Sequence, residues 1–109
     1  MVAPKLFGSA ARTRLLTLVA LLEETYPREL ARLSGVPLVS TQRIVNSLER
    51  EGVIATRLIG ANRRVTLNPR FYGFNELRSL LLKYAKRDQD LEQRAASLRR
   101  RPRRAGKRL

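Results

Sequence analysis

Residues 27–52 read PRELARLSGVPLVSTQRIVNSLEREG, and this stretch decides the expected fold. Pro27 suits the first position of a helix, because its missing amide hydrogen would have no partner there. Gly35 suits a tight turn after about two helical turns, since glycine adopts positive φ angles at no steric cost. A second helix is expected over residues 38–51, ending at Gly52. The side chains expected to face the core are Leu30, Ala31, Leu33, Thr41, Ile44, Val45 and Leu48.

The opposite side of the second helix is polar. Gln42 and Asn46 lie four residues apart and therefore share a helical face. An α-helix fits the major groove of DNA, where amide side chains pair with adenine and a guanidinium such as that of Arg43 pairs with guanine. The methyl groups of Val39 can meet thymine, and Ser40 is expected to bond a phosphate or a base edge. The pattern predicts a helix-turn-helix, and the alternative is an ordinary solvated helix face.

Before this pair, the chain is expected to form a supporting helix. Ser9 can serve as its N-cap, because its hydroxyl can accept a hydrogen bond from a free amide of the first turn. Apolar residues at i, i+3, i+4 and i+7 lie on one face of this helix, namely Leu15, Leu18, Val19 and Leu22. We expect it to be a core element without ligand contacts.

After the pair, residues 53–58 and 65–67 have the β-branched content of two strands. Gly60, Ala61 and Asn62 are expected to form the turn of a β-hairpin. Its basic residues are Arg57, Arg63 and Arg64, and we expect them near the tip. A hairpin that only covers the core explains the apolar strand residues, but it does not explain two adjacent arginines at the tip.

The C-terminal part combines an aromatic cluster with a helix. Phe71, Tyr72 and Phe74 are expected to plug the core or a dimer seam, and stacking on single-stranded bases is the alternative. The apolar residues that follow repeat the helical pattern, and a seven-residue spacing continues it through Leu91 and Leu98. We therefore expect a dimer helix, with seam residues Leu77, Leu81, Tyr84 and Leu91.

The charge is strongly unbalanced, with 23 Lys and Arg against 9 Asp and Glu and a net charge of +14. Residues 94–109 contain eight basic residues and no acidic one. This excess implies a polyanionic partner, and nucleic acid is favoured over a membrane because no strongly amphipathic surface helix accompanies the tail. Pro102 and Gly106 oppose a regular helix, so we expect a disordered basic arm on DNA. The alternative is that genome base composition favours Arg over Lys and that the excess charge only aids solubility.

Several classes of function are excluded by what the sequence lacks. The chain has no cysteine and no histidine, its carboxylates are scattered, and it has no glycine-rich phosphate loop. We therefore expect no enzyme, no metal and no cofactor. The longest apolar run, residues 15–22, is far shorter than the roughly 20 residues that cross a membrane, and two glutamates follow it instead of a cleavage site. We expect a cytoplasmic, nucleoid-associated protein without a ligand pocket, which binds constitutively or under the control of a protein partner.

The order of these elements resembles a known family. The segments PRELARLSGV, STQRIVNSLEREGVI and RRVTLNP are similar to those of winged-helix transcriptional regulators of the ArsR-like superfamily. The likeness is closest to prokaryotic members whose hairpin, the wing, ends in Asn-Pro before an ELR-LLLK helix, here residues 76–83. Pro37 stands where the family usually has a Ser or Thr N-cap, so Ser40 is an alternative cap of the second helix. The metal-sensing branch uses Cys and His ligands that this chain lacks.

Residues and resemblance together predict a winged helix-turn-helix, mainly α with a small β-hairpin (α+β). The DNA-binding domain is expected at residues 1–90, and a helix extension with the basic tail at residues 91–109. The chain is expected to regulate transcription as a homodimer on a palindromic site in double-stranded DNA, with the recognition helix at 38–51 and the wing at 53–67. The residues expected to read bases are Val39, Ser40, Gln42, Arg43 and Asn46. Those expected on the DNA backbone are Arg28, Arg57, Asn62, Arg63, Arg64, Arg99, Arg100, Arg101, Arg103, Arg104, Lys107 and Arg108.

Two other classes of function remain open at this stage. One is an RNA-binding or nonspecific architectural protein that uses the same basic surface with little sequence preference. The other is a protein-interaction module that partners a nucleotidyltransferase or a toxin, since this fold binds protein as well as DNA.

Overall fold

Five helices and one β-hairpin make up residues 7–100, the part of the chain that the computed structural model describes. In chain order they are α1 (Ala10–Leu22), α2 (Pro27–Ser34), α3 (Leu38–Arg50), β1 (Ile54–Ile59), β2 (Asn62–Leu67), α4 (Phe74–Arg87) and α5 (Gln89–Arg100). The expectation of a mainly helical chain with a small hairpin is confirmed. No helix among residues 7–100 is long and apolar enough to cross a membrane. The predicted tail residues Arg101, Arg103, Arg104, Lys107 and Arg108 lie outside the described residues, as do the side chains of Arg99 and Arg100.

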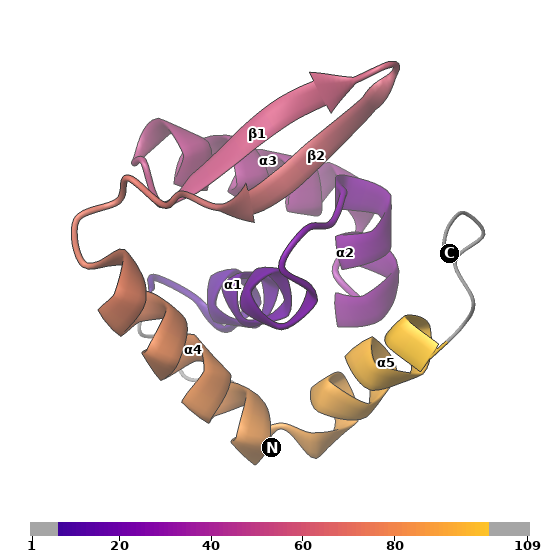
Figure 1. The fold of residues 1–109 in the computed structure, drawn as a ribbon. Helices are drawn as coiled ribbons and strands as arrows, with labels where there is room; N and C mark the ends of the chain where they lie inside the picture. The colour runs from indigo at the N-terminus through magenta and orange to yellow at the C-terminus, as the bar shows by residue number, and fades with distance from the viewer. Residues whose placement is uncertain (1–6, 101–109) are drawn as a thin grey trace.

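Helix α1 lies at the centre of the molecule (Figure 1). The hairpin lies on one side of it, α2 stands beside it, and α4 and α5 form a V around its other side. Every residue of α1 from Leu15 to Leu21 is buried. The sequence predicted one buried face, whereas the structure buries residues such as Leu16 and Leu21 as well, because neighbouring elements cover α1 on all sides.

The hydroxyl groups of Ser9, Thr13 and Thr17 form their hydrogen bonds within α1 or at its first turn. Ser9 Oγ accepts from the amide of Arg12 at 3.1 Å, which confirms the predicted N-cap. The buried hydroxyls of Thr13 and Thr17 donate back to the carbonyls of Ser9 and Thr13 at 3.0 and 2.7 Å. Such back-bonding allows a hydroxyl to be buried without a distant partner.

The turn between α2 and α3 forms as predicted. Pro27 is the first residue of α2, and Gly35 adopts a φ of 81° in the left-handed region. Helix α3 begins at Leu38, and the carbonyl of Pro37 accepts from the amide of Thr41 at 2.8 Å. The alternative of Ser40 as the cap is therefore wrong, because the first helical hydrogen bond already starts at Pro37.

The second strand of the hairpin is longer and the turn is shorter than predicted. β1 and β2 pair antiparallel along their whole length, which leaves Gly60 and Ala61 as a two-residue turn. The φ of Gly60 is 63°, a value that favours glycine and that two-residue hairpin turns require. The assignment of Asn62 to the turn is therefore wrong, since it is the first residue of β2. Arg63 and Arg64 likewise lie within the strand and not at the tip.

A short segment ahead of α2 pairs with the hairpin as well. The amide of Thr25 donates to the carbonyl of Val65 at 3.0 Å, and the amide of Val65 donates to the carbonyl of Thr25 at 2.8 Å. The Thr25 hydroxyl also donates to the buried carboxylate of Glu29 at 2.6 Å. These bonds fix the free edge of β2 against the start of α2.

The helix predicted to run on beyond Tyr84 is interrupted at Asp88. Its Oδ1 accepts from the amide of Leu91 at 3.1 Å, so Asp88 caps the start of α5 and the chain changes direction. Helices α4 and α5 form a V around α1 (Figure 1). Leu81 and Leu91 are 0% and 1% exposed and belong to the hydrophobic core. Their assignment to a dimer seam is corrected, because both side chains fill the core of their own chain. Leu77 and Tyr84 are half-buried.

Helix α5 is part of the packed domain. Leu91 and Ala95 lie in the hydrophobic core. The guanidinium of Arg94 donates to the carbonyl of Leu33 at 2.9 Å, at the C-terminal end of α2 where a cation is favourable. The expected domain boundary at residue 90 therefore falls inside a single packed structure.

The aromatic cluster divides between core and surface. Phe74 packs against the core and Phe71 is half-buried, so the expectation of a core plug holds for Phe74. Tyr72 is 96% exposed, so it does not plug the core. The amide of Phe74 bonds the carbonyl of Phe71 at 2.9 Å, and this tight turn leaves Tyr72 on the outside.

The packing of α5 predicts the effect of truncating Leu91. Leu91→Ala should lower the free energy of unfolding by roughly 2–4 kcal/mol, because a truncated buried leucine leaves a cavity. The matched control is Leu58→Ala, whose side chain is 72% exposed and whose loss should change stability by less than about 1 kcal/mol. Urea unfolding of the full chain measures both. Equal effects of the two substitutions would mean that α5 does not belong to the core.

Candidate nucleic-acid interface

Helix α3 presents an exposed polar face. Val39 is 66% exposed, and Gln42, Arg43 and Asn46 are also exposed. These residues follow one another at i, i+3, i+4 and i+7 and therefore form one continuous strip. Among the described residues none of the three polar side chains has a hydrogen-bond partner. The structure thus brings four of the five predicted base-reading residues together, whereas Ser40 lies at the half-buried margin.

The opposite side of α3 anchors this strip. Thr41, Val45 and Leu48 are 0%, 1% and 2% exposed. They pack in the direction of α2 and β1, the two elements that α3 contacts most. The Thr41 hydroxyl is satisfied by the carbonyl of Val36 at 3.3 Å. Because this side is closed by apolar packing, the rotation of α3 about its axis is determined and the polar strip must face outward.

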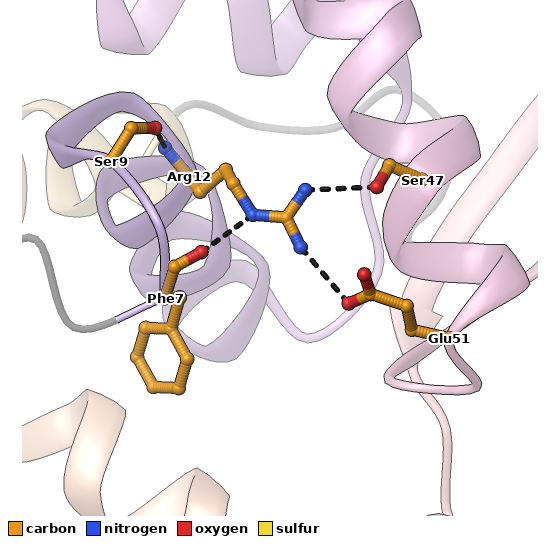
Figure 2. Close-up of polar contacts among 5 residues, drawn as sticks. All are labelled: Phe7, Ser9, Arg12, Ser47 and Glu51. Carbon is orange, nitrogen blue, oxygen red and sulfur yellow. Dashed lines mark hydrogen bonds and ion pairs between the residues drawn. The ribbon is translucent and has the colours of Figure 1, made fainter.

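Arg12 of α1 fastens the C-terminal half of α3 (Figure 2). Its guanidinium lies between the two helices and donates to the hydroxyl of Ser47 at 2.9 Å and to the carboxylate of Glu51 at 3.0 Å. Its Nε donates to the carbonyl of Phe7 at 2.6 Å. Sequence reasoning missed this clamp, because a basic residue near the start of a helix gives no sign of a partner 35 or 39 residues later.

Asn68 holds the junction between α3 and the hairpin. Its Nδ2 donates to the carbonyl of Gly52 at 2.9 Å, and its amide donates to the carbonyl of Val53 at 3.0 Å. The sequence identified Asn68 only as the residue that stops a strand. In the structure it ties both ends of the hairpin to the end of α3.

A second polar link connects the hairpin to α3 itself. The carboxylate of Glu49 accepts from the guanidinium of Arg63 at 2.9 Å and from the hydroxyl of Thr56. Arg63 is therefore engaged in an ion pair within the chain, although it was predicted only as a backbone contact. Exposed pairs of this kind contribute about 0–1 kcal/mol and exchange partners readily, so the guanidinium remains able to reach a phosphate.

The predicted backbone-binding residues do not lie on one surface. Directly opposed residues of an antiparallel pair share a face of the sheet. Arg63 pairs with Leu58 and lies on the face that carries the bond to Glu49, whereas Arg57 and Arg64 pair with each other and lie on the other face. Arg28 is exposed in the first turn of α2. The basic residues predicted near a common tip are thus separated by the pleat of the hairpin.

The tip of the hairpin is more apolar than the sequence analysis anticipated. Leu58 and Ile59 are 72% and 44% exposed, next to the Gly60–Ala61 turn, and Asn62 is exposed beside them. The sequence does show this feature, since two large apolar residues stand directly before the turn glycine. The sequence pattern assigns Leu58 to the end of a strand and Ile59 to no element, because it does not show that the ladder continues to Ile59 and Asn62.

Comparison with known proteins does not assign the chain to a family. No protein-family model matches it, and searches of curated proteins and of solved structures give no significant match. A functional assignment therefore depends on the residues and on their geometry.

The Arg12 clamp predicts a loss of stability when it is removed. Arg12→Ala should lower the free energy of unfolding by roughly 1–3 kcal/mol, because Ser47, Glu51 and the carbonyl of Phe7 lose a charged donor. Arg78→Ala, which removes an exposed arginine in the middle of α4, is the control and should change stability by less than about 0.5 kcal/mol. Thermal and urea unfolding measure the difference. An unchanged Arg12→Ala protein would show that α3 is held by apolar packing alone.

Proposed function

We propose that the chain is a winged helix-turn-helix protein that binds double-stranded DNA in a sequence-specific manner and regulates transcription. The observation that carries the proposal is the strip of Val39, Gln42, Arg43 and Asn46. It is exposed, its polar side chains have no partner among the described residues, and the other side of its helix is closed by the core. In this proposal α3 is the recognition helix and the hairpin is the wing.

The composition of the strip supports base reading. Amide side chains pair bidentately with adenine, arginine pairs with guanine, and a methyl group contacts thymine. Gln42, Arg43 and Asn46 lie within just over one helical turn, so they can address adjacent base pairs. The rigid attachment of α3 through Arg12 and Asn68 favours specificity, because donors held in place lose little freedom on binding.

The surrounding basic residues support affinity rather than sequence reading. Arg28 is exposed on α2, which packs against α3, and Arg63 lies on the wing face that bonds Glu49 of α3, so both basic residues flank the recognition helix. Residues on such flanks bond phosphates and set the register of a protein on the duplex. The net charge of +14 adds long-range attraction to the duplex.

A homodimer on a palindromic site is part of the proposal, with a smaller seam than the sequence predicted. Leu81 and Leu91 are buried and do not contribute. Leu77 and Tyr84 are half-buried, and Leu80 beside them is 38% exposed. These three share one side of α4 at i, i+3 and i+7. In the proposal Leu77 and Tyr84 remain from the predicted seam, and Leu80 is added to it.

Selection from a random duplex library at near-physiological salt tests the proposal. The full chain should enrich a short motif, and Arg43→Ala should relax the preference at one position and cost roughly 1–3 kcal/mol of binding free energy. Arg87→Ala removes an exposed arginine at the end of α4 and should leave the motif unchanged. A palindromic motif would support the dimer. Enrichment of no motif would contradict specific reading, and a parallel selection from RNA would then test the nonspecific alternative.

The salt dependence of duplex binding tests the role of the tail. Arg101, Arg103, Arg104, Lys107 and Arg108 are all changed to Gln in one full-length variant. For every phosphate that the tail no longer neutralises, the slope of log K against log salt should become shallower by about 0.9, while the selected motif stays the same. Lys86→Gln with Arg87→Gln on α4 serves as the control for loss of charge. A slope equal to that of the unaltered chain would show that the tail does not touch the phosphates.

A further inference from the structure

The outer face of the hairpin, which is turned away from the core, carries a row of residues from three segments. The bridge between Thr25 and Val65 continues the antiparallel pairing of β1 and β2. It places Tyr26 beside Arg64, which pairs with Arg57, and it places Glu24 beside Thr66, which pairs with Ala55. We call these six residues the outer hairpin face. Glu24, Ala55, Arg57, Arg64 and Thr66 of this face, together with Thr56, line a hollow of about 360 Å³.

Arg57 and Arg64 lie directly opposite each other in the sheet. Like charges in this position destabilise a pair of strands. The other arginines that fasten elements of the fold have carboxylates: Arg12 pairs with Glu51, Arg63 with Glu49 and Arg94 with Asp90. Within residues 7–98, neither Arg57 nor Arg64 has an ion pair or a side-chain hydrogen bond. The guanidinium of Arg57 and the terminal nitrogens of Arg64 are therefore free to bind an anion.

Arg64 is held in place by Tyr26. Its guanidinium carbon lies 5.9 Å from the centroid of the Tyr26 ring, a distance at which a cation is attracted to the aromatic face. Its Nε is buried and unbonded within the described part of the chain. A guanidinium oriented in advance loses little freedom when it binds, and its planar fork suits an oxyanion.

The residues beside Arg57 and Arg64 on the outer hairpin face provide space and further polar groups for a ligand. Ala55 and Thr66 have small side chains and leave room beside the arginines. The Thr66 hydroxyl, which has no partner among the described residues, can donate to an oxyanion, and the exposed carboxylate of Glu24 can accept from a hydroxyl. Two guanidiniums with a hydroxyl suit a phosphate group. The carboxylate beside them suits a ligand that carries hydroxyl groups next to its phosphate.

We propose that the outer hairpin face is a binding site for a phosphate monoester of a polyhydroxylated small molecule, separate from the strip on α3. The two surfaces are separate because the opposite face of the hairpin bears Ile54, Val65 and Leu67 in the core and joins α3 through Glu49. The sequence led us to expect no ligand pocket. The hollow depends on pairing between Thr25 and Val65, which are 40 residues apart in the chain.

The test is a titration of the ¹⁵N-labelled full chain with inorganic phosphate and with ribose 5-phosphate, followed by NMR. Sodium chloride at the same ionic strength is the reference. Signals of Tyr26, Arg57, Arg64 and Thr66 should shift with both phosphates and not with chloride. Ribose 5-phosphate should bind more tightly than inorganic phosphate, because Glu24 can accept from its hydroxyls. Shifts no larger than those with chloride would overturn the proposal.

Variants assign the binding to the arginine pair. Arg57→Gln, at an exposed position, should weaken phosphate binding about tenfold, as expected for the loss of a charged hydrogen-bond donor. Arg64→Lys keeps the charge but loses the planar fork, and it should weaken binding as well. Arg87→Gln removes the same charge from α4 and should bind phosphate like the unaltered chain. Equal affinities of Arg57→Gln and Arg87→Gln would overturn the proposal.

The same variants distinguish a free phosphate ester from a phosphate of DNA. If Arg57→Gln binds duplex normally and ribose 5-phosphate does not displace duplex, the site takes a small molecule, as proposed. If Arg57→Gln loses affinity for both and the sugar phosphate competes with duplex, the phosphate belongs to the DNA backbone and the small-molecule site is rejected. The titration is independent of the duplex selection, so failure of specific DNA reading would leave its result unaffected.

Discussion

The burial of α1 on every side is the constraint on which the rest of the structure depends. A helix without a solvent face requires an apolar surface from each neighbour. α2, the hairpin, α4 and α5 provide these surfaces, with Leu30, Val65, Leu81 and Leu91 at 0–1% exposure. Helix α3 packs outside this ring on α2 and β1, so only one of its sides is covered. The exposed strip on α3 is therefore a consequence of how the core is closed.

Polar contacts then fix the relative positions of helices and hairpin that apolar packing alone does not determine. Arg12 joins α1 to α3, Asn68 joins the hairpin to the end of α3, and Arg94 joins α5 to the end of α2. Each contact involves a hydrogen bond whose geometry is specific. The result is a candidate recognition helix held at its far end by a part-buried clamp, with its reading residues free of partners within the described chain.

The arginines illustrate how little the net charge says about function. Arg12, Arg63 and Arg94 have ion pairs within the chain, while Arg43 has none among the described residues. Arg57 and Arg64 form a pair of like charges on a face that is turned away from α3. The arginines of this chain thus serve as structural clamps, as a proposed base contact or as a proposed anion site. Only their positions in the fold distinguish these roles.

Local patterns in the sequence determined the helices, the Ser9 cap, the Gly35 turn, the presence of a hairpin and the polar strip of α3. These features depend on residues within a few positions of one another, where periodicity and glycine conformation are decisive. The tertiary structure alone decided the hairpin register, the break at Asp88 and the burial of Leu81 and Leu91. It also decided the Arg12 clamp and the outer hairpin face. The hairpin register and the Asp88 cap involve neighbouring residues, but several registers and helix ends satisfy the local pattern and packing selects one. The burial of Leu81 and Leu91, the Arg12 clamp and the outer hairpin face arise between segments far apart in the chain, where only the packing around α1 decides which residues meet.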